Sequence, residues 1–155
     1  MGEKLKSFEK LFWKKASERI EKGEKFLGVF SRKFIKDLEH LIGTDLGSKA
    51  GKGGIGRRRR PFIARYEHKE CRYFTAFLTT KPYSRIFVNL DPCGKKERGL
   101  CTGLESNCFV LKDRKRGQAL LYGIPKERFE EFEFELCGFC HNMDVLERLK
   151  LEVID

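Results

Sequence analysis

The sequence predicts an α+β protein: an N-terminal helical hairpin, a basic glycine-rich loop, and a small antiparallel β-barrel with a C-terminal helix. Apolar residues recur at helical spacing as far as residue 42, and glycine and arginine then dominate one segment. From Pro61 onward the apolar runs become short, aromatic or β-branched, and separated by turn residues. A chain of 155 residues suffices for one domain with an appendage. We therefore expect three parts, at residues 1–43, 44–60 and 61–155.

The first part is expected to be a basic helical hairpin. Residues 3–22 place apolar side chains close to one helix face, and Gly23 is expected to end that helix. A second helix is expected over residues 24–42, ending at Gly43. Its apolar stripe contains Phe26, Val29, Phe30, Phe34, Leu38, Leu41 and Ile42. A stripe of this kind packs into a core more often than it lies on a membrane surface.

The loop that follows concentrates positive charge. Residues 47–60 read GSKAGKGGIGRRRR, without one acid. Residues 1–60 contain 17 Lys and Arg against 8 acids, whereas residues 61–155 contain 16 against 15. Such a field favours a polyanion as partner, and the arginine fork suits phosphate oxygens. We expect this loop to bind nucleic acid, RNA rather than DNA, and the candidate RNA-binding residues are Lys49, Lys52, Arg57, Arg58, Arg59 and Lys81.

Short strands are expected from Pro61 onward. The runs are PFIARYEH, CRYFTAFLTT, RIFVNL, NCFVLKD and QALLYGI. Four or five short strands with no helix between them predict a small barrel or a strongly bent sheet. A short helix is expected over KERFEEF, and a last helix or strand over MDVLERLKLEVI.

Two polar side chains stand at strand ends. Arg60 precedes the first predicted strand, while Thr79, followed by Thr80, ends the second. If these strands are neighbours, the pair can hold a phosphate, with arginine offsetting negative charge and the hydroxyl donating a hydrogen bond. RNA carries its own nucleophile, the 2′-hydroxyl, so cleavage at such a site needs neither a metal nor a covalent side-chain nucleophile.

The order of these motifs resembles the MazF/PemK toxin family over residues 47–153. The motifs are RPFIA at 60–64, FLTTK at 77–81, IFVNL at 86–90, SNCFVL at 106–111 and IPKERF at 124–129. The resemblance implies an SH3-like barrel that forms a homodimer, with an acidic antitoxin as partner. It also implies a metal-independent endoribonuclease, requiring no cofactor, that cleaves single-stranded RNA and leaves a 2′,3′-cyclic phosphate. The family's catalytic Arg maps onto Arg60 and its Thr or Ser onto Thr79, with Thr80 as the alternative.

This sequence departs from the family pattern in two ways. Family members begin with a strand directly before the loop, where a helical hairpin is expected here. The cysteines are also foreign to the family. Cys137 and Cys140 form a C-x-x-C followed by His141, and a structural zinc would draw its ligands from Cys93, Cys101, Cys108, Cys137 and Cys140. The alternatives are disulfides, such as Cys93 with Cys101, or free thiols, and Cys71 is expected in the core.

The compartment is expected to be the cytoplasm. No stretch approaches the roughly 20 apolar residues of a membrane span, and the N-terminus lacks the pattern of a secretory signal. Abundant Lys, Glu and Arg with a single Gln resemble heat-adapted proteins, whose intracellular chains tolerate disulfides. Two other functions remain open: a non-catalytic RNA- or ribosome-binding module, with or without structural zinc, and a DNA-binding or regulatory protein that uses the hairpin.

Overall fold

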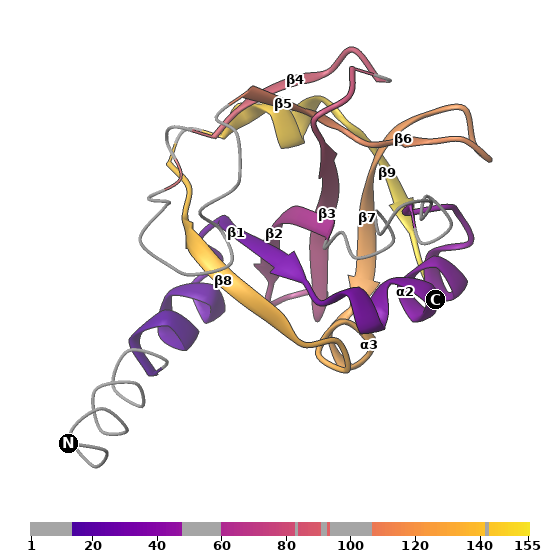
Figure 1. The fold of residues 1–155 in the computed structure, drawn as a ribbon. Helices are drawn as coiled ribbons and strands as arrows, with labels where there is room; N and C mark the ends of the chain where they lie inside the picture. The colour runs from indigo at the N-terminus through magenta and orange to yellow at the C-terminus, as the bar shows by residue number, and fades with distance from the viewer. Residues whose placement is uncertain (1–13, 48–59, 83, 91–92, 94–106, 142) are drawn as a thin grey trace, which may run out of the picture.

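The protein is an α+β structure built around a curled, mostly antiparallel sheet, which confirms the predicted class (Figure 1). The computed structural model describes residues 14–47, 60–82, 84–90, 93, 107–141 and 143–155. The SH3-like form of the barrel remains a prediction.

Each of the five runs predicted as strands from Pro61 onward contains a strand, whereas the strand at Phe134–Phe139 was not predicted. The described strands are β1 (Phe26–Phe30), β2 (Arg60–Glu67), β3 (Arg72–Thr79), β4 (Phe87–Asn89), β5 (Asn107–Val110), β6 (Lys112–Asp113), β7 (Gln118–Pro125), β8 (Phe134–Phe139) and β9 (Lys150–Val153). The described helical segments are residues 14–21, η1 (Arg32–Phe34), α2 (Ile35–Ile42), α3 (Lys126–Phe129) and η4 (Asp144–Arg148). The last predicted segment thus contains both a short helix, η4, and a strand, β9.

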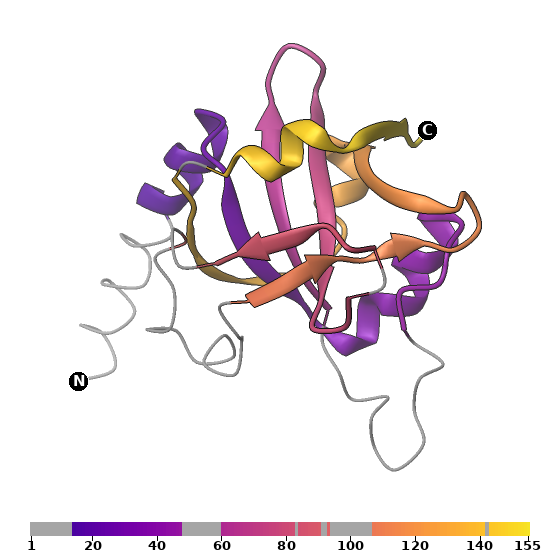
Figure 2. The same ribbon diagram turned by 90° about the horizontal axis from the view of Figure 1, so that it is seen from above.

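The sheet follows the order β4-β5-β3-β2-β1-β8, and β7 branches from β3 to pair with β6 and, in parallel, with β9. Figures 1 and 2 show β4 and β5 lying across one end of the sheet formed by β1, β2 and β3. The segments after the two edge strands, β4 and β8, meet where Cys93 and Cys140 form a β-bridge and a disulfide. The bond therefore joins opposite edges of the curled sheet.

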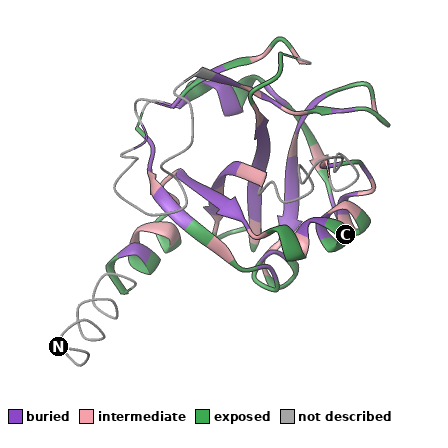
Figure 3. Cartoon of the chain, viewed as in Figure 1, coloured by how far each residue is buried: buried purple, intermediate pink, exposed green. Residues whose placement is uncertain are grey.

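Residues 26–30 form a strand, and the predicted helical hairpin is wrong. β1 pairs with β2 on one side and β8 on the other, and all five of its residues are buried (Figure 3). Successive side chains enter two different core clusters, so the run is apolar on both faces and shows no strand period. A Cβ at Gly28 would lie 2.7 Å from the Phe62 ring, so this close packing needs glycine. The boundary after residue 43 does not separate two units, because β1 lies inside the sheet.

The helices end where the sequence predicts. Residues 14–21 are helical and Gly23 follows with φ +87°, while α2 ends at Gly43 with φ +80°. Both glycines adopt the left-handed conformation that other residues avoid. Among the described residues, no helix combines the length and the apolar character needed to cross a membrane.

Two hydrophobic clusters fill the two faces of the sheet. One is aromatic and includes α2 and α3; its largest fully buried members are Phe26, Phe30, Phe62, Phe77 and Phe129. The other is mainly aliphatic and packs β4, β5 and η4 against β1, β2 and β3. Burying one such large side chain stabilises the fold by about 1.5–3 kcal/mol. This packing holds the ends of β2 and β3, where the candidate site lies.

Candidate functional site

Arg60 and Thr79, the two residues predicted to hold a phosphate, lie at the start of β2 and the end of β3. The β2–β3 pairing ends at Phe62 and Phe77, two residues short of Arg60 and Thr79. Because side chains alternate along a strand, both lie on the face of those two phenylalanines. At this point β2 pairs with β1, and β3 pairs with β5. The site therefore lies where two central strands part.

The guanidinium of Arg60 joins the segment after α2 to the end of β3. Its Nη1 donates to the carbonyl of Leu78 at 2.8 Å, and its Nε donates to the carbonyl of Leu46 at 3.0 Å. Leu78 directly precedes Thr79, so the guanidinium lies beside the peptide that carries the threonine. The Arg60 residue is half-buried, which partly shields its charge from water.

The segment after α2 is itself held in place. Glu39 accepts a hydrogen bond from the N–H of Leu46 at 2.6 Å, and Asp45 accepts one from the N–H of Gly47 at 2.7 Å. A Cβ at Gly47 would lie 2.5 Å from Arg60 Nη2. Sequence reasoning did not identify the roles of Glu39 and Gly47, because they depend on how this segment folds back against β2.

By alternation along the strands, Thr79 rather than Thr80 shares the sheet face of Arg60. Thr79 is half-buried at the end of β3, and its Oγ1 accepts a hydrogen bond from the N–H of Lys81 at 3.2 Å. That contact uses the oxygen as an acceptor, so the O–H is the donor that a phosphate would take. Thr80 and Lys81 are exposed in the bend that follows. The other candidate RNA-binding residues, Lys49, Lys52, Arg57, Arg58 and Arg59, lie outside the described residues.

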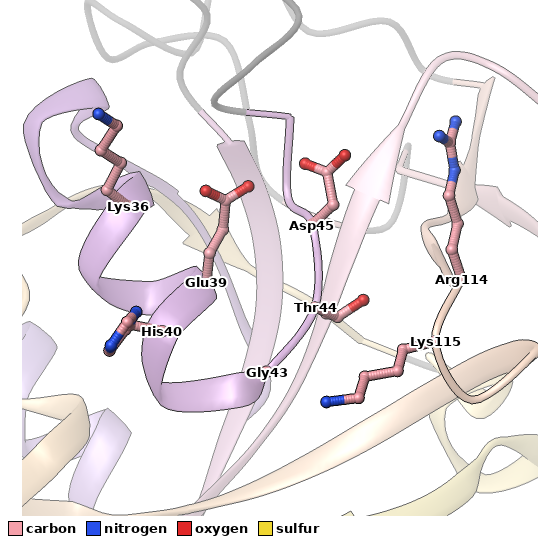
Figure 4. Close-up of a pocket in the computed structure, with 8 residues that line it drawn as sticks. All are labelled: Lys36, Glu39, His40, Gly43, Thr44, Asp45, Arg114 and Lys115. Atoms are coloured by element: carbon pink, nitrogen blue, oxygen red, sulfur yellow. The ribbon is translucent and has the colours of Figure 1, made fainter.

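A pocket of about 540 Å³ opens between α2, the segment after it and the β6–β7 hairpin. Its lining is mixed in charge: Lys36, Glu39, His40, Gly43, Thr44, Asp45, Arg114 and Lys115. Figure 4 shows the carboxylates of Glu39 and Asp45 pointing the same way, with Arg114 on the facing hairpin. Since both acids also bond to the backbone that holds Arg60, we assign them to ordering the site.

A buried carboxylate anchors the β6–β7 hairpin. Asp113 accepts hydrogen bonds from Arg116 Nη1 at 2.7 Å and from the Tyr122 hydroxyl at 2.8 Å, while Arg116 Nη2 donates to the carbonyl of Ile42 at 3.1 Å. Burial by itself raises the pKa of Asp113, but the hydrogen bonds from Arg116 and Tyr122 outweigh it and the pKa is lowered. The pKa of Tyr122 is raised, first by burial and then by Asp113. The network ties the hairpin to the end of α2.

Of the three states considered for the cysteines, the zinc site does not fit this structure. Cys93 and Cys140 are bonded to each other, and Cys137 is also disulfide-bonded. Three of the five proposed ligands are thus occupied by sulfur–sulfur bonds, and Cys101 lies outside the described residues. Within the described ranges, no group of three or more His, Cys, Asp or Glu side chains is placed to hold a metal.

The disulfide partner of Cys93 and the position of Cys71 differ from expectation. Cys93 pairs with Cys140, so the suggested pairing with Cys101 is wrong. Cys71 is exposed rather than in the core, and it occupies the turn before β3 with φ +52°. Cys108 is buried, with its thiol 3.7 Å from the carbonyl of Val88.

Comparison with known proteins yields no relative: no family model, no curated protein and no solved structure matches the chain. The resemblance to the MazF/PemK family therefore rests on the motifs alone and remains a prediction.

Proposed function

We propose that the protein is an endoribonuclease that cleaves single-stranded RNA with the RNA's own 2′-hydroxyl as nucleophile. The observation that carries this proposal, made where β2 and β3 part, is that the guanidinium of Arg60 donates to the carbonyl of Leu78 and so lies next to the peptide of Thr79. A phosphodiester bound between them receives charge-assisted hydrogen bonds from the guanidinium and a hydrogen bond from the threonine hydroxyl.

In the proposed reaction the 2′-oxygen attacks phosphorus, and the bond from phosphorus to the 5′-oxygen breaks. The proton of the 2′-hydroxyl passes to water, and the departing 5′-oxygen takes up a proton from Arg60 or from water. The products are a 2′,3′-cyclic phosphate and a 5′-hydroxyl. Arginine stays protonated to high pH, so its larger role is to offset the negative charge that develops on the phosphoryl oxygens. Thr79 positions the phosphate.

The chain around the site supports this proposal. A strand, β1, precedes the basic segment, as in the family that the motifs resemble, although η1 and α2 lie between them. The basic run from Arg57 leads directly into Arg60, so its charges flank any RNA held there. An acidic antitoxin, a homodimer and a cytoplasmic location belong to the same proposal. The disulfide fits that location in a heat-adapted organism, whose intracellular proteins retain such bonds.

The proposal is tested by incubating the purified protein, in EDTA, with a long single-stranded RNA and mapping the product ends. We expect discrete cuts with cyclic phosphate ends. Removing one donor that stabilises developing charge costs about 10²–10³ in rate, so Arg60→Ala should abolish visible cleavage. The melting temperature of each variant serves as the folding control. Intact RNA after incubation with the folded wild-type protein would overturn the proposal.

One observation favours a second candidate function. Two N–H groups of Arg60 already donate to backbone carbonyls, as in an arginine that only stabilises a fold. In that case the protein binds RNA or the ribosome through the same basic surface without cutting it. RNA that is shifted on a gel but remains intact, with Arg60→Ala changing stability alone, would support this binding module.

A further inference from the structure

A second concave surface, lined by other residues than the mixed-charge pocket, carries four cationic side chains. It has a volume of about 560 Å³ and lies between the segment before β4, the ends of the β6–β7 hairpin, and the start of β9. The described residues that line it include no Asp or Glu; they are Ser84, Arg85, Ile86, Lys112, Gly117, Gln118, Ala119, Arg148 and Lys150. We call this surface the basic pocket.

Its four cations are exposed, and the described part of the chain offers them no ion pair. Within the described residues, no salt bridge involves Arg85, Lys112, Arg148 or Lys150, although ion pairs occur elsewhere on the surface. Like charges gathered in a concavity repel one another and raise the local concentration of anions. The chemistry of the pocket, cationic side chains with one hydroxyl and one amide, is that of a phosphate site.

The backbone of Arg85 adds an independent observation. Its φ is +61°, a left-handed conformation that residues with a side chain rarely adopt. Strained residues persist where the surrounding structure determines them, and they concentrate at functional positions. Here the strained residue is also one of the four cations. Replacing Arg85 with glycine therefore removes the positive charge while it relieves the backbone strain.

The basic pocket is connected to the Arg60–Thr79 site by two routes. Ser84 follows Thr79 by five residues, which limits the distance between their Cα atoms to about 18 Å. Lys112 follows Leu111, whose N–H donates at 2.7 Å to the carbonyl of Phe77, two residues before Thr79. A single strand of a few nucleotides spans such a distance, and single-strand-binding domains contact roughly 4–16 nucleotides.

We infer that the basic pocket binds a phosphate of the same single-stranded RNA, several nucleotides from the one held by Arg60 and Thr79. This inference rests on the proposed function for the identity of the ligand. In this arrangement the pocket supplies binding energy and direction to the strand, while the Arg60–Thr79 site acts on the bond.

The test is the salt dependence of binding to a single-stranded 2′-O-methyl RNA, which has no 2′-hydroxyl and cannot be cleaved through it. The logarithm of the affinity falls linearly with the logarithm of the salt concentration, and each lost contact with a single-strand phosphate makes that slope shallower by about 0.7. We expect Arg148→Gln with Lys150→Gln to weaken binding about 10-fold and to reduce the slope, since charge-assisted contacts are lost. The charge-matched control, Lys22→Gln with Lys69→Gln, lies on exposed positions elsewhere and should leave the slope unchanged.

Arg85→Gly provides the sharper variant. Glycine relieves the left-handed backbone, so the protein should melt no lower than wild type and yet bind the RNA more weakly. A structural role for Arg85 cannot produce that combination. Pocket variants that bind with the affinity and slope of the control would overturn the inference, whatever the cleavage assay shows. Weaker binding by the pocket variants, with no cleavage by wild type, would retain the pocket and reject the proposed nuclease.

Discussion

The guanidinium of Arg60 occupies the space that a side chain at Gly47 would need. A Cβ at residue 47 would lie 2.5 Å from Arg60 Nη2, and Gly47 has φ +97°, in the left-handed region. The neighbouring Leu46 accepts the hydrogen bond from Arg60 Nε. The backbone after α2 therefore sets the position of the guanidinium, and a larger residue at 47 must displace it.

Gly47→Ala should slow RNA cleavage by about 100-fold, since a displacement near 1 Å at a catalytic group has that cost. It should also lower the free energy of unfolding by about 1–2 kcal/mol, because alanine resists a left-handed backbone. Single-turnover rates and thermal melts measure the two effects. Gly23→Ala is the matched control: φ is +87° there, and the added Cβ would lie 3.3 Å from the carbonyl oxygen of Tyr66, outside both proposed RNA contacts. It should lose similar stability without loss of rate; equal rates for both variants would reject a positioning role for Gly47.

Glu39 should be a positioning residue for the same site. Its carboxylate accepts the N–H of Leu46 at 2.6 Å, and hydrogen bonds to charged groups contribute about 1.5–3 kcal/mol. Glu39→Ala should destabilise the protein by that amount and slow cleavage. Glu39→Gln should retain most of the stability and most of the cleavage rate, because its amide oxygen still accepts the hydrogen bond from the N–H of Leu46. Asp37→Ala, on an exposed position of the same helix, is the control, and an equal loss there would argue against the contact.

The Cys93–Cys140 disulfide should stabilise the fold by joining the edges of the sheet. It closes a separation of 47 residues, which the chain-entropy account converts to about 4 kcal/mol. Cys93→Ser with Cys140→Ser should therefore shift the denaturant midpoint sharply downward, and a reductant should shift that of wild type. Cys71→Ser, at the exposed thiol, should leave the midpoint unchanged. A wild-type midpoint that is insensitive to reductant would contradict the prediction.

Stability should fall in acid partly through Asp113. Its pKa is lowered in the folded protein, so its contribution is complete above the unfolded value near 3.9 and is lost as pH falls through the folded value. Urea midpoints measured from neutral pH to acid should show this loss for wild type. Asp113→Asn should be less stable at neutral pH and show a shallower loss, whereas the exposed Asp144→Asn should follow wild type. Parallel pH curves for all three would refute the role of Asp113.

Local signals in the sequence predicted much of the fold. Gly43 ends α2, and the short aromatic runs after Pro61 form strands, because these features act within a few residues. The segment FLGVF was predicted as part of a helix and is a strand. A strand buried on both faces is apolar throughout, so it lacks the alternation that identifies a strand. β8 was missed although Glu133, Phe134, Glu135 and Leu136 alternate polar with apolar, which is the period of a strand.

From the sequence, only the site residues that stand at strand ends could be predicted. Arg60 and Thr79 stand at the ends of two successive strands, and successive strands are often neighbours, so the sequence could indicate that Arg60 lies near the end of β3. The partners of Arg60 in the segment after α2 depend on tertiary packing, and no spacing in the sequence encodes them. Cysteine connectivity is equally non-local, since six cysteines allow 15 complete pairings and only the fold selects among them.

The most direct test of the central claim is a double-mutant cycle on RNA cleavage, with single-turnover rates measured for wild type, Arg60→Ala, Thr79→Val and the double variant. If the two residues act on one phosphate, each single change should cost about 10² or more, and the double variant should be hardly slower than the worse single variant. Losses that multiply in full, or single variants that cleave at the wild-type rate, would contradict a site shared by Arg60 and Thr79.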